Sequence, residues 1–146
     1  TFFFFLHGSS SDKIINVPLI GMLTAGLLIG GFYPLTQIYQ HKQDAADGIT
    51  SISSMLGYKG TFIFTAIVYI LAMCSLGFYL ISSLQQNNFL IIQIFFIPIL
   101  VYFLWWFKKV YANTQAASFK NTMRMNMLAS FFSNAAFITL LILEKY

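Results

Sequence analysis

Four long apolar segments contain no Asp, Glu, Lys or Arg and are separated by polar stretches. They cover residues 17–39, 61–81, 89–107 and 127–143. Because a helix rises about 1.5 Å per residue, roughly 20 apolar residues cross a hydrocarbon core of about 30 Å. The apolar runs are continuous and do not alternate, which is typical of helices and not of barrel strands. The segments therefore predict an all-α, polytopic transmembrane bundle with about four complete spans.

The scarcity of charge supports this fold class. Charged residues make up 8% of the chain, against roughly 25% in an ordinary soluble domain. Hydrophobic residues reach 58%, and a soluble domain of this size could not bury so much apolar surface. We therefore expect an integral membrane protein in contact with lipid, located in a bacterial plasma membrane.

The first six residues are apolar but lack the Met and the basic region of a signal peptide. Six residues are too few to cross a bilayer, so we interpret them as the tail of an earlier helix. On this interpretation residues 1–146 are the C-terminal half of a longer membrane domain, whose N-terminal half is missing.

The basic residues predict the orientation of the helices. With four crossings, the loops at 40–60 and 108–126 lie on one side of the membrane and the remaining connections lie on the other. The first side holds Lys42, Lys59, Lys108, Lys109, Lys120 and Arg124, and the second holds only Lys13 and Lys145. Basic residues are retained on the cytoplasmic side, so both long loops should be cytoplasmic. The same residues explain the net charge of +4 without a nucleic-acid partner.

Two local patterns predict how the helices pack and where they meet the interface. Gly26-xxx-Gly30 predicts a surface on which a neighbouring helix of the bundle packs closely. Trp105 and Trp106, followed by basic residues, predict an aromatic belt at the membrane interface.

One stretch after the first apolar segment collects polar groups and reads YPLTQIYQHKQDAADG over residues 33–48. If the helix continues past Tyr39, four polar side chains share one face at about 3.6 residues per turn. They are Tyr33, Gln37, Gln40 and Asp44. Carboxylates and amides at the mouth of a cavity suit Mg²⁺ with a bound phosphate, whose charge Lys42 and Lys59 would help to hold. The spacing alone also allows a helix end that simply faces water.

This stretch resembles the second aspartate-rich motif of the UbiA superfamily of membrane prenyltransferases. Asp44 matches the second aspartate of that motif and Gly48 its glycine. Ser51 (or Thr50) matches its threonine and Gly57 its last glycine, whereas Gln40 stands where the first aspartate belongs. Three more helices follow the motif in that family, and three apolar segments follow it here. The family's other aspartate-rich motif is absent from these residues.

The resemblance implies Mg²⁺-dependent transfer of a prenyl group, within the membrane, from a polyprenyl diphosphate to an acceptor, commonly an aromatic ring. We expect Asp44, Gln40 and Asp47 to be the metal ligands, although Asp47 has no clear counterpart in the motif. From the polar face and the basic loops we expect the substrate-binding residues to be Tyr33, Gln37, Lys42, Lys59 and Arg124. No residue of this chain receives a catalytic role beyond binding.

A second interpretation is a membrane protein without catalytic activity, either half of a transporter or a degenerate relative of the prenyltransferases. A transporter usually carries ionisable groups or broken helices at the centre of the membrane. The apolar segments here contain no charged residue. That absence favours the enzyme over the transporter.

Overall fold

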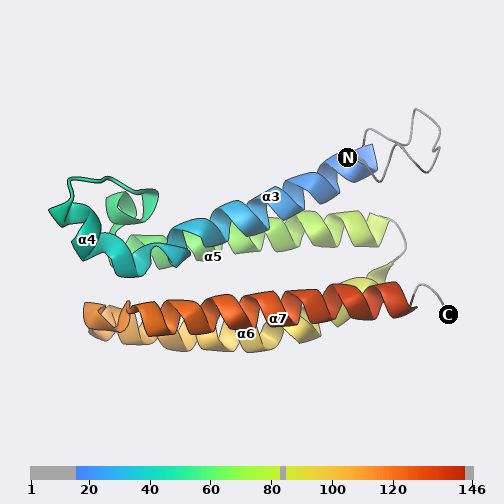
Figure 1. Cartoon of the computed structure of the whole chain (residues 1–146). Coiled ribbons are helices and arrows are strands. Elements are labelled where there is room, and N and C mark those ends of the chain that lie inside the picture. The colour runs from blue at the N-terminus through green and yellow to red at the C-terminus, as the bar shows by residue number, and fades with distance from the viewer. Residues whose placement is uncertain (1–15, 83–84, 144–146) are drawn as a thin grey trace.

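A computed structural model describes residues 16–82 and 85–143, and the part that it describes contains helices and no strand. Four long helices run back and forth (Figure 1). They are α3 (Asn16–Thr36), α5 (Ile52–Ser82), α6 (Gln86–Ala112) and α7 (Phe119–Leu143). A short helix, α4 (His41–Ala46), and the 3₁₀ turns η1 (Ile38–Gln40) and η2 (Thr114–Ala116) lie in the connections. The predicted all-α bundle is confirmed.

The outer surface of the bundle is apolar. All four long helices are long and apolar enough to cross a membrane. Large apolar side chains are exposed along them, such as Ile29 at 73%, Phe131 at 68% and Leu141 at 67%. So much exposed apolar surface is unfavourable in water but costs nothing in hydrocarbon, so lipid contact accounts for it.

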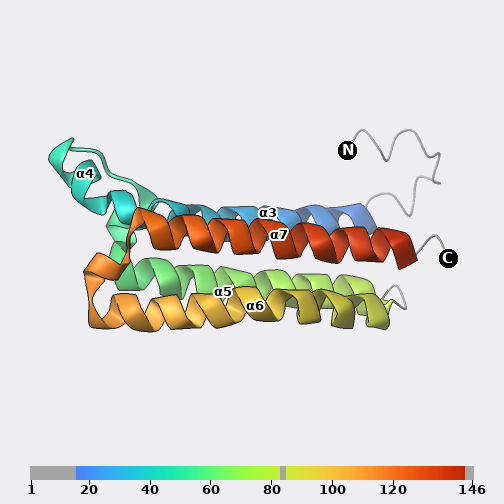
Figure 2. The same ribbon diagram turned by 60° about the horizontal axis from the view of Figure 1, so that its bottom comes forward.

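The helices associate as two pairs, α3 with α5 and α6 with α7 (Figure 1). After a rotation by 60°, α3 lies beside α7 and α5 beside α6, which closes the bundle (Figure 2). The Thr65 hydroxyl donates to the Gly31 carbonyl over 3.0 Å, and the Thr24 hydroxyl donates to Ser75 over 2.9 Å. Both bonds join α3 to α5, where lipid offers polar groups no alternative partner.

The close approach of α3 to α5 occurs at Gly31, and the prediction for Gly26-xxx-Gly30 is wrong within the described residues. A Cβ added to Gly31 would meet the side chain of Val68. A Cβ added to Gly26 or Gly30 would meet nothing within 4 Å. Those two glycines lie on the exposed side of α3, because the α5 contact uses the neighbouring face of the helix.

An aromatic cluster joins α5 to α6 near the α4 end. The ring of Phe62 lies 5.0 Å from Trp106, 5.4 Å from Phe103 and 5.2 Å from Phe107. Trp106 is fully buried, and its indole N–H donates to the Ala116 carbonyl over 2.8 Å. Trp106 therefore belongs to the core and not to the predicted belt, whereas Trp105 is 41% exposed.

The helices extend beyond the apolar segments at most of their ends. Helix α5 begins nine residues before the predicted 61, and α7 begins eight residues before the predicted 127. Hydropathy marks only the part of a helix that suits hydrocarbon, so it misses polar helical turns at the interface. The exception is α3, which ends at Thr36 and not at 39.

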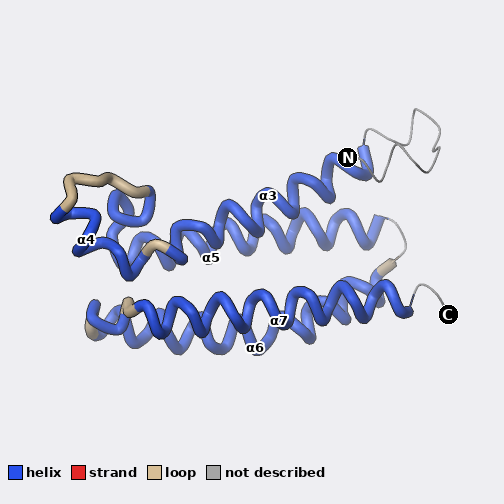
Figure 3. The backbone as a smooth tube through the Cα atoms, in the orientation of Figure 1, coloured by secondary structure: helices blue, strands red, loops and turns tan. Residues whose placement is uncertain are grey.

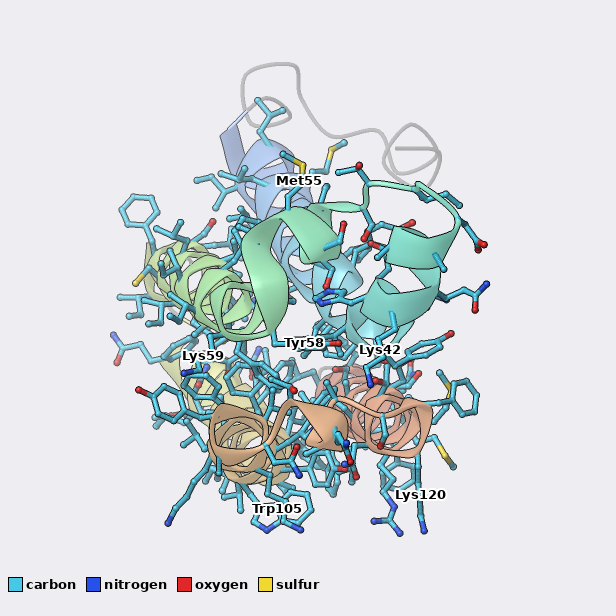
Figure 4. All side chains as sticks on the ribbon, turned by 90° about the vertical axis from the view of Figure 1, so that its left-hand side faces the viewer. Lys42, Met55, Tyr58, Lys59, Trp105 and Lys120 are labelled. Carbon is cyan, nitrogen blue, oxygen red and sulfur yellow. The ribbon has the colours of Figure 1, made fainter. Side chains whose placement is uncertain are left out.

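The connections at 40–60 and 108–126 lie at the same end of the bundle, as predicted, and the end of α5 and the beginning of α6 lie at the other (Figure 1). Lys42, Lys59 and Lys120 lie at that end and are spread across the view onto it (Figure 4). The predictions for residues 1–6, Lys13 and Lys145 fall outside the described residues. Which side of the membrane this end faces stays a prediction.

Candidate polar site at the α4 end

The chain breaks its helix twice between α3 and α5 (Figure 3). Pro34 lies in the last turn of α3, and the Gln37 N–H donates to the Pro34 carbonyl over 3.2 Å, which closes a tight turn. The 3₁₀ turn η1 and helix α4 then follow. The predicted continuous face from Tyr33 to Asp44 is therefore wrong, because α3 does not continue past Thr36.

Gly48 ends α4 with a positive φ of 67°. The Ile49 N–H donates to the Asp44 carbonyl over 2.8 Å, and the Asp47 N–H donates to the Gln43 carbonyl over 2.9 Å. A bond that spans five residues around a left-handed glycine is the usual stop of an α-helix. The spacing of Asp44 and Gly48 therefore has a local structural cause.

Ser51 begins α5 through a reciprocal cap. The Ser51 N–H donates to the Ser54 hydroxyl oxygen over 2.9 Å, and the Ser54 N–H donates to the Ser51 hydroxyl oxygen over 3.1 Å. Such caps satisfy N–H groups that have no partner in the first turn of a helix. A few residues later Gly57 interrupts α5 with a φ of 69° and a ψ of 175°.

Asp44 is the central carboxylate of this end of the bundle. Its side chain is only 8% exposed, and its Oδ2 accepts a hydrogen bond of 3.0 Å from the Ser51 hydroxyl. Among the described residues no cationic side chain forms an ion pair with it. The N-terminus of α5, which Ser51 caps, offers a partial positive charge nearby. One neutral hydroxyl and a helix end therefore face this carboxylate, and no cationic side chain of the described residues is paired with it.

A buried chain of polar side chains lies beside Asp44. The Nε2 atom of His41 lies 2.7 Å from the Ser53 hydroxyl, which lies 3.2 Å from the Thr61 hydroxyl. Thr61 in turn donates to the Gly57 carbonyl over 2.8 Å. All three contacts are hydrogen bonds if the His41 Nε2–H donates to Ser53, the Ser53 hydroxyl donates to Thr61, and the Thr61 hydroxyl donates to the Gly57 carbonyl. His41 then carries its proton on Nε2, and the chain joins α4 to the start of α5.

Sequence reasoning missed this chain of polar residues. His41 and Asp44 are three residues apart, but no second His or Cys lies near them for a zinc site, and the sequence spacing does not relate Ser53 or Thr61 to His41. Their spacing becomes informative only because Gly57 bends the start of α5 and so brings Ser53 back toward Thr61. The four hydroxyl residues among residues 50–54 are the one signal that the sequence offers.

The predicted metal ligands lie on one short helix and at its two ends, in different surroundings. Gln40 precedes α4, and its amide N–H donates to the Tyr39 hydroxyl over 2.8 Å. Asp47 is exposed, and its carboxylate accepts a hydrogen bond of 2.8 Å from the Gln43 amide. Only Asp44 is buried. The structure therefore distinguishes Asp44 from the other two.

The predicted substrate-binding residues are dispersed. Tyr33 is 55% exposed, and its hydroxyl accepts a hydrogen bond of 3.3 Å from the Gln37 amide, so these two form a pair of their own at the end of α3. Lys42 is exposed on α4, and the Lys59 ammonium lies 3.9 Å from the Tyr111 ring centroid. Arg124 is exposed on α7. Lys42 and Lys59 lie on opposite sides of the view onto this end (Figure 4).

The donor set fits Mg²⁺ only in part. Among the described residues, no three or more His, Cys, Asp or Glu side chains form a group that could hold a metal ion. Mg²⁺ does not need such a group, because it commonly takes one or two carboxylates and fills its shell with waters and substrate phosphates. Asp44 supplies a carboxylate that lacks a charged partner, so it suits one position in such a shell.

Comparisons with protein-family models, with curated proteins and with solved structures found no match. Any functional inference therefore depends on the residues at the α4 end and on the motif that they form.

Proposed function

We propose that this chain is part of a membrane prenyltransferase in which Asp44 helps to bind Mg²⁺ and the diphosphate of a polyprenyl donor. The observation that carries the proposal is the buried carboxylate of Asp44, whose one hydrogen-bond partner among the described residues is the neutral Ser51 hydroxyl. Burying a charge without a partner is costly, so such a carboxylate is expected where a cation binds.

The position of Asp44 suits a substrate with a polar head and an apolar tail. Asp44 lies at the α4 end of the bundle, where the chain carries most of its cations. The helices that lead away from this end are apolar on their outer surfaces. A prenyl chain would lie in hydrocarbon while its diphosphate meets the polar end, which we expect to face the cytoplasm of a bacterium. The acceptor would be lipophilic, with an aromatic ring as its reacting group.

The residues of this chain would bind and orient the donor. Asp44 would be the metal ligand, and Lys42 a cation for the phosphate oxygens. Gln40 and Asp47, which lie just before and just after α4, bind Tyr39 and Gln43 and would stay outside the metal shell. When bound, Mg²⁺ would neutralise the negative charge that grows on the leaving diphosphate. His41, through its bond to Ser53, would hold α4 against α5 and so position Asp44.

One observation favours the alternative, a membrane protein without catalytic activity. Gly48 and Gly57 both have positive φ values, so the fold requires them whether or not the protein is an enzyme. Ser51 likewise caps α5. A relative that had lost its chemistry would keep all three residues for structural reasons.

Direct binding distinguishes the two functions. Titration of the purified protein with Mg²⁺ and farnesyl thiodiphosphate, an analogue that reacts poorly, should give saturable binding. The variant Asp44→Asn should bind at least about 30-fold more weakly, since truncating one member of a desolvated charge pair costs about 2 kcal/mol or more. Asp47→Asn, with the same loss of charge on an exposed residue, is the matched control.

Two results would count against the proposal. If the unmodified protein does not bind the analogue at all, the proposal that Asp44 helps to bind a prenyl diphosphate fails. If Asp44→Asn and Asp47→Asn bind it equally well, the ligand lies elsewhere and the assignment of Asp44 is wrong.

A further inference from the structure

We propose that the end of α6 binds the headgroup of an anionic phospholipid whose acyl chain lies along the outer face of the same helix. This inference does not depend on prenyl transfer. It begins with five apolar side chains on α6, which we name the α6 stripe. They are Leu90, Ile94, Ile97, Val101 and Leu104, and each is at least 54% exposed.

The α6 stripe leads directly to a cation. Its members are spaced alternately four and three residues apart, so they lie on one face of the helix. Lys108 and Tyr111 continue this spacing, and both are exposed. From Lys108, about ten residues of helix cover half of a hydrocarbon core of about 30 Å, which is one leaflet. The apolar face therefore ends in a positive charge at the depth expected for a headgroup.

Two further lysines flank Lys108, and each lies over an aromatic ring. The ammonium group of Lys59, on α5, lies 3.9 Å from the ring centroid of Tyr111. The ammonium group of Lys109 lies 4.1 Å from the ring centroid of Trp105. A ring face attracts a cation without taking up its N–H donors, so both ammonium groups keep donors for an anion. Tyr and Trp rings also favour the level of the headgroups.

Few negative charges oppose this cluster. In the described residues the only acidic side chains are Asp44 and Asp47, and both belong to α4 and its end. Lys59 and Trp105 lie on the α6 side of the view onto this end, and Lys42 lies across it (Figure 4). The C-terminus of α6 adds a partial negative charge, which explains why cations gather here but is too small to neutralise three of them.

The positive-inside rule alone does not require this arrangement. That rule needs only an excess of basic residues somewhere in the cytoplasmic loops. It makes no demand that two consecutive lysines end an exposed apolar stripe, or that a lysine of α5 lies over a ring of the same helix end. Anionic phospholipid is the occupant that combines an acyl chain for the stripe with a phosphate for the lysines.

Trp105 is a natural reporter for this site. The protein would be reconstituted in phosphatidylcholine vesicles in which either phosphatidylglycerol or phosphatidylcholine carries brominated acyl chains. Bromine quenches tryptophan fluorescence on contact, and subtraction of the spectrum of Trp105→Phe leaves the signal of Trp105. Brominated phosphatidylglycerol should quench Trp105 at a lower mole fraction than brominated phosphatidylcholine.

The variant K108Q/K109Q should lower this preference by about fivefold for each lysine removed. K42Q/K120Q removes two charges from the same end of the bundle but not from α6, and it should keep the preference. K108R/K109R should also keep it, because both cations remain, and circular dichroism should show unchanged helix content in every variant.

The inference is overturned if both brominated lipids quench Trp105 equally, or if K42Q/K120Q lowers the preference as much as K108Q/K109Q does. It is also overturned if millimolar inorganic phosphate abolishes the preference, since the lysines would then form a site for free phosphate.

Discussion

Replacing Gly31 with alanine should weaken the packing of α3 against α5. The added Cβ would lie 2.5 Å from Cγ1 and 2.7 Å from Cβ of Val68, distances that real Cβ atoms do not reach. Because the Cβ of Val68 is attached to its own backbone, it cannot rotate away, and the two helices must separate. Separation would also stretch the 3.0 Å bond from Thr65 to the Gly31 carbonyl.

The magnitude follows from two opposing effects. Overpacking of this kind costs roughly 1–3 kcal/mol, and contact with a branched Cβ places this site near the upper limit. Alanine favours a helix over glycine by about 1 kcal/mol. We therefore expect Gly31→Ala to lower the free energy of unfolding by about 2 kcal/mol, from these two ranges.

Gly30→Ala is the matched control, because a Cβ there meets nothing within 4 Å. It should raise the free energy of unfolding by up to about 1 kcal/mol. Unfolding of the detergent-solubilised protein by increasing SDS, followed by circular dichroism, measures both. The double variant Gly31→Ala/Val68→Ala should recover part of the loss, because it removes the two Cγ methyl groups. Equal stability of Gly30→Ala and Gly31→Ala would refute the close approach at Gly31.

Three further perturbations test other parts of the structure. Ser53→Ala should lower the free energy of unfolding by about 1–3 kcal/mol in the same assay, because it leaves the buried His41 ring without its hydrogen-bond partner. The control Thr50→Ala, on the exposed loop, should stay within about 0.5 kcal/mol of the original protein. Gly48→Ala should lower the free energy of unfolding by about 1–2 kcal/mol, because alanine adopts the φ of 67° at this position less readily than glycine. Gly48→Asn should lower it less, because asparagine tolerates the left-handed region, and equal effects would argue against the left-handed cap. Cysteines placed at Lys42 and Thr114 in a Cys74→Ser background should both resist an impermeant thiol reagent in intact cells, and labelling of either from outside would reverse the orientation.

The sequence predicted the number of long helices and the gathering of basic residues at one end, because both depend on hydropathy and charge alone. It could not predict which glycine packs closely. Gly26, Gly30 and Gly31 are equally small, and which of them meets α5 depends on the rotation of α3 about its axis. For the same reason Trp105 and Trp106 were both predicted to lie at the membrane interface, but Trp106 is buried in the core and Trp105 is exposed.

At the candidate site the sequence identified Asp44 but not its surroundings. The break after Thr36 follows from Pro34 and a turn whose geometry no periodicity reveals. The bond from Ser51 to Asp44 and the chain from His41 to Thr61 both join α4 to the beginning of α5. Such contacts arise only once the loop between them has a shape, and the two glycines with positive φ set that shape.

Capping explains Gly48 and Ser51 but not the side chain of Asp44, and this difference leads to a last prediction. At its position before the α4 stop, Asp44 contributes only its backbone carbonyl, which any residue could supply. Asp44 is nevertheless only 8% exposed, and its carboxylate has a neutral partner, Ser51. Without Mg²⁺ and a prenyl diphosphate analogue, Asp44→Asn should therefore be at least as stable as the original protein, since it keeps the shape and removes a buried charge.

With Mg²⁺ and the analogue at about 100 times the dissociation constant, the original protein should gain about 2.7 kcal/mol, and Asp44→Asn should gain far less. The order of stability would then reverse between the two conditions, as monitored by SDS-induced unfolding. Asp47→Asn should show no reversal, because Asp47 is exposed and its carboxylate is paired with Gln43. If Asp44→Asn is markedly less stable than the original protein without ligand, the carboxylate serves the fold itself, and its burial gives no reason to expect a cation.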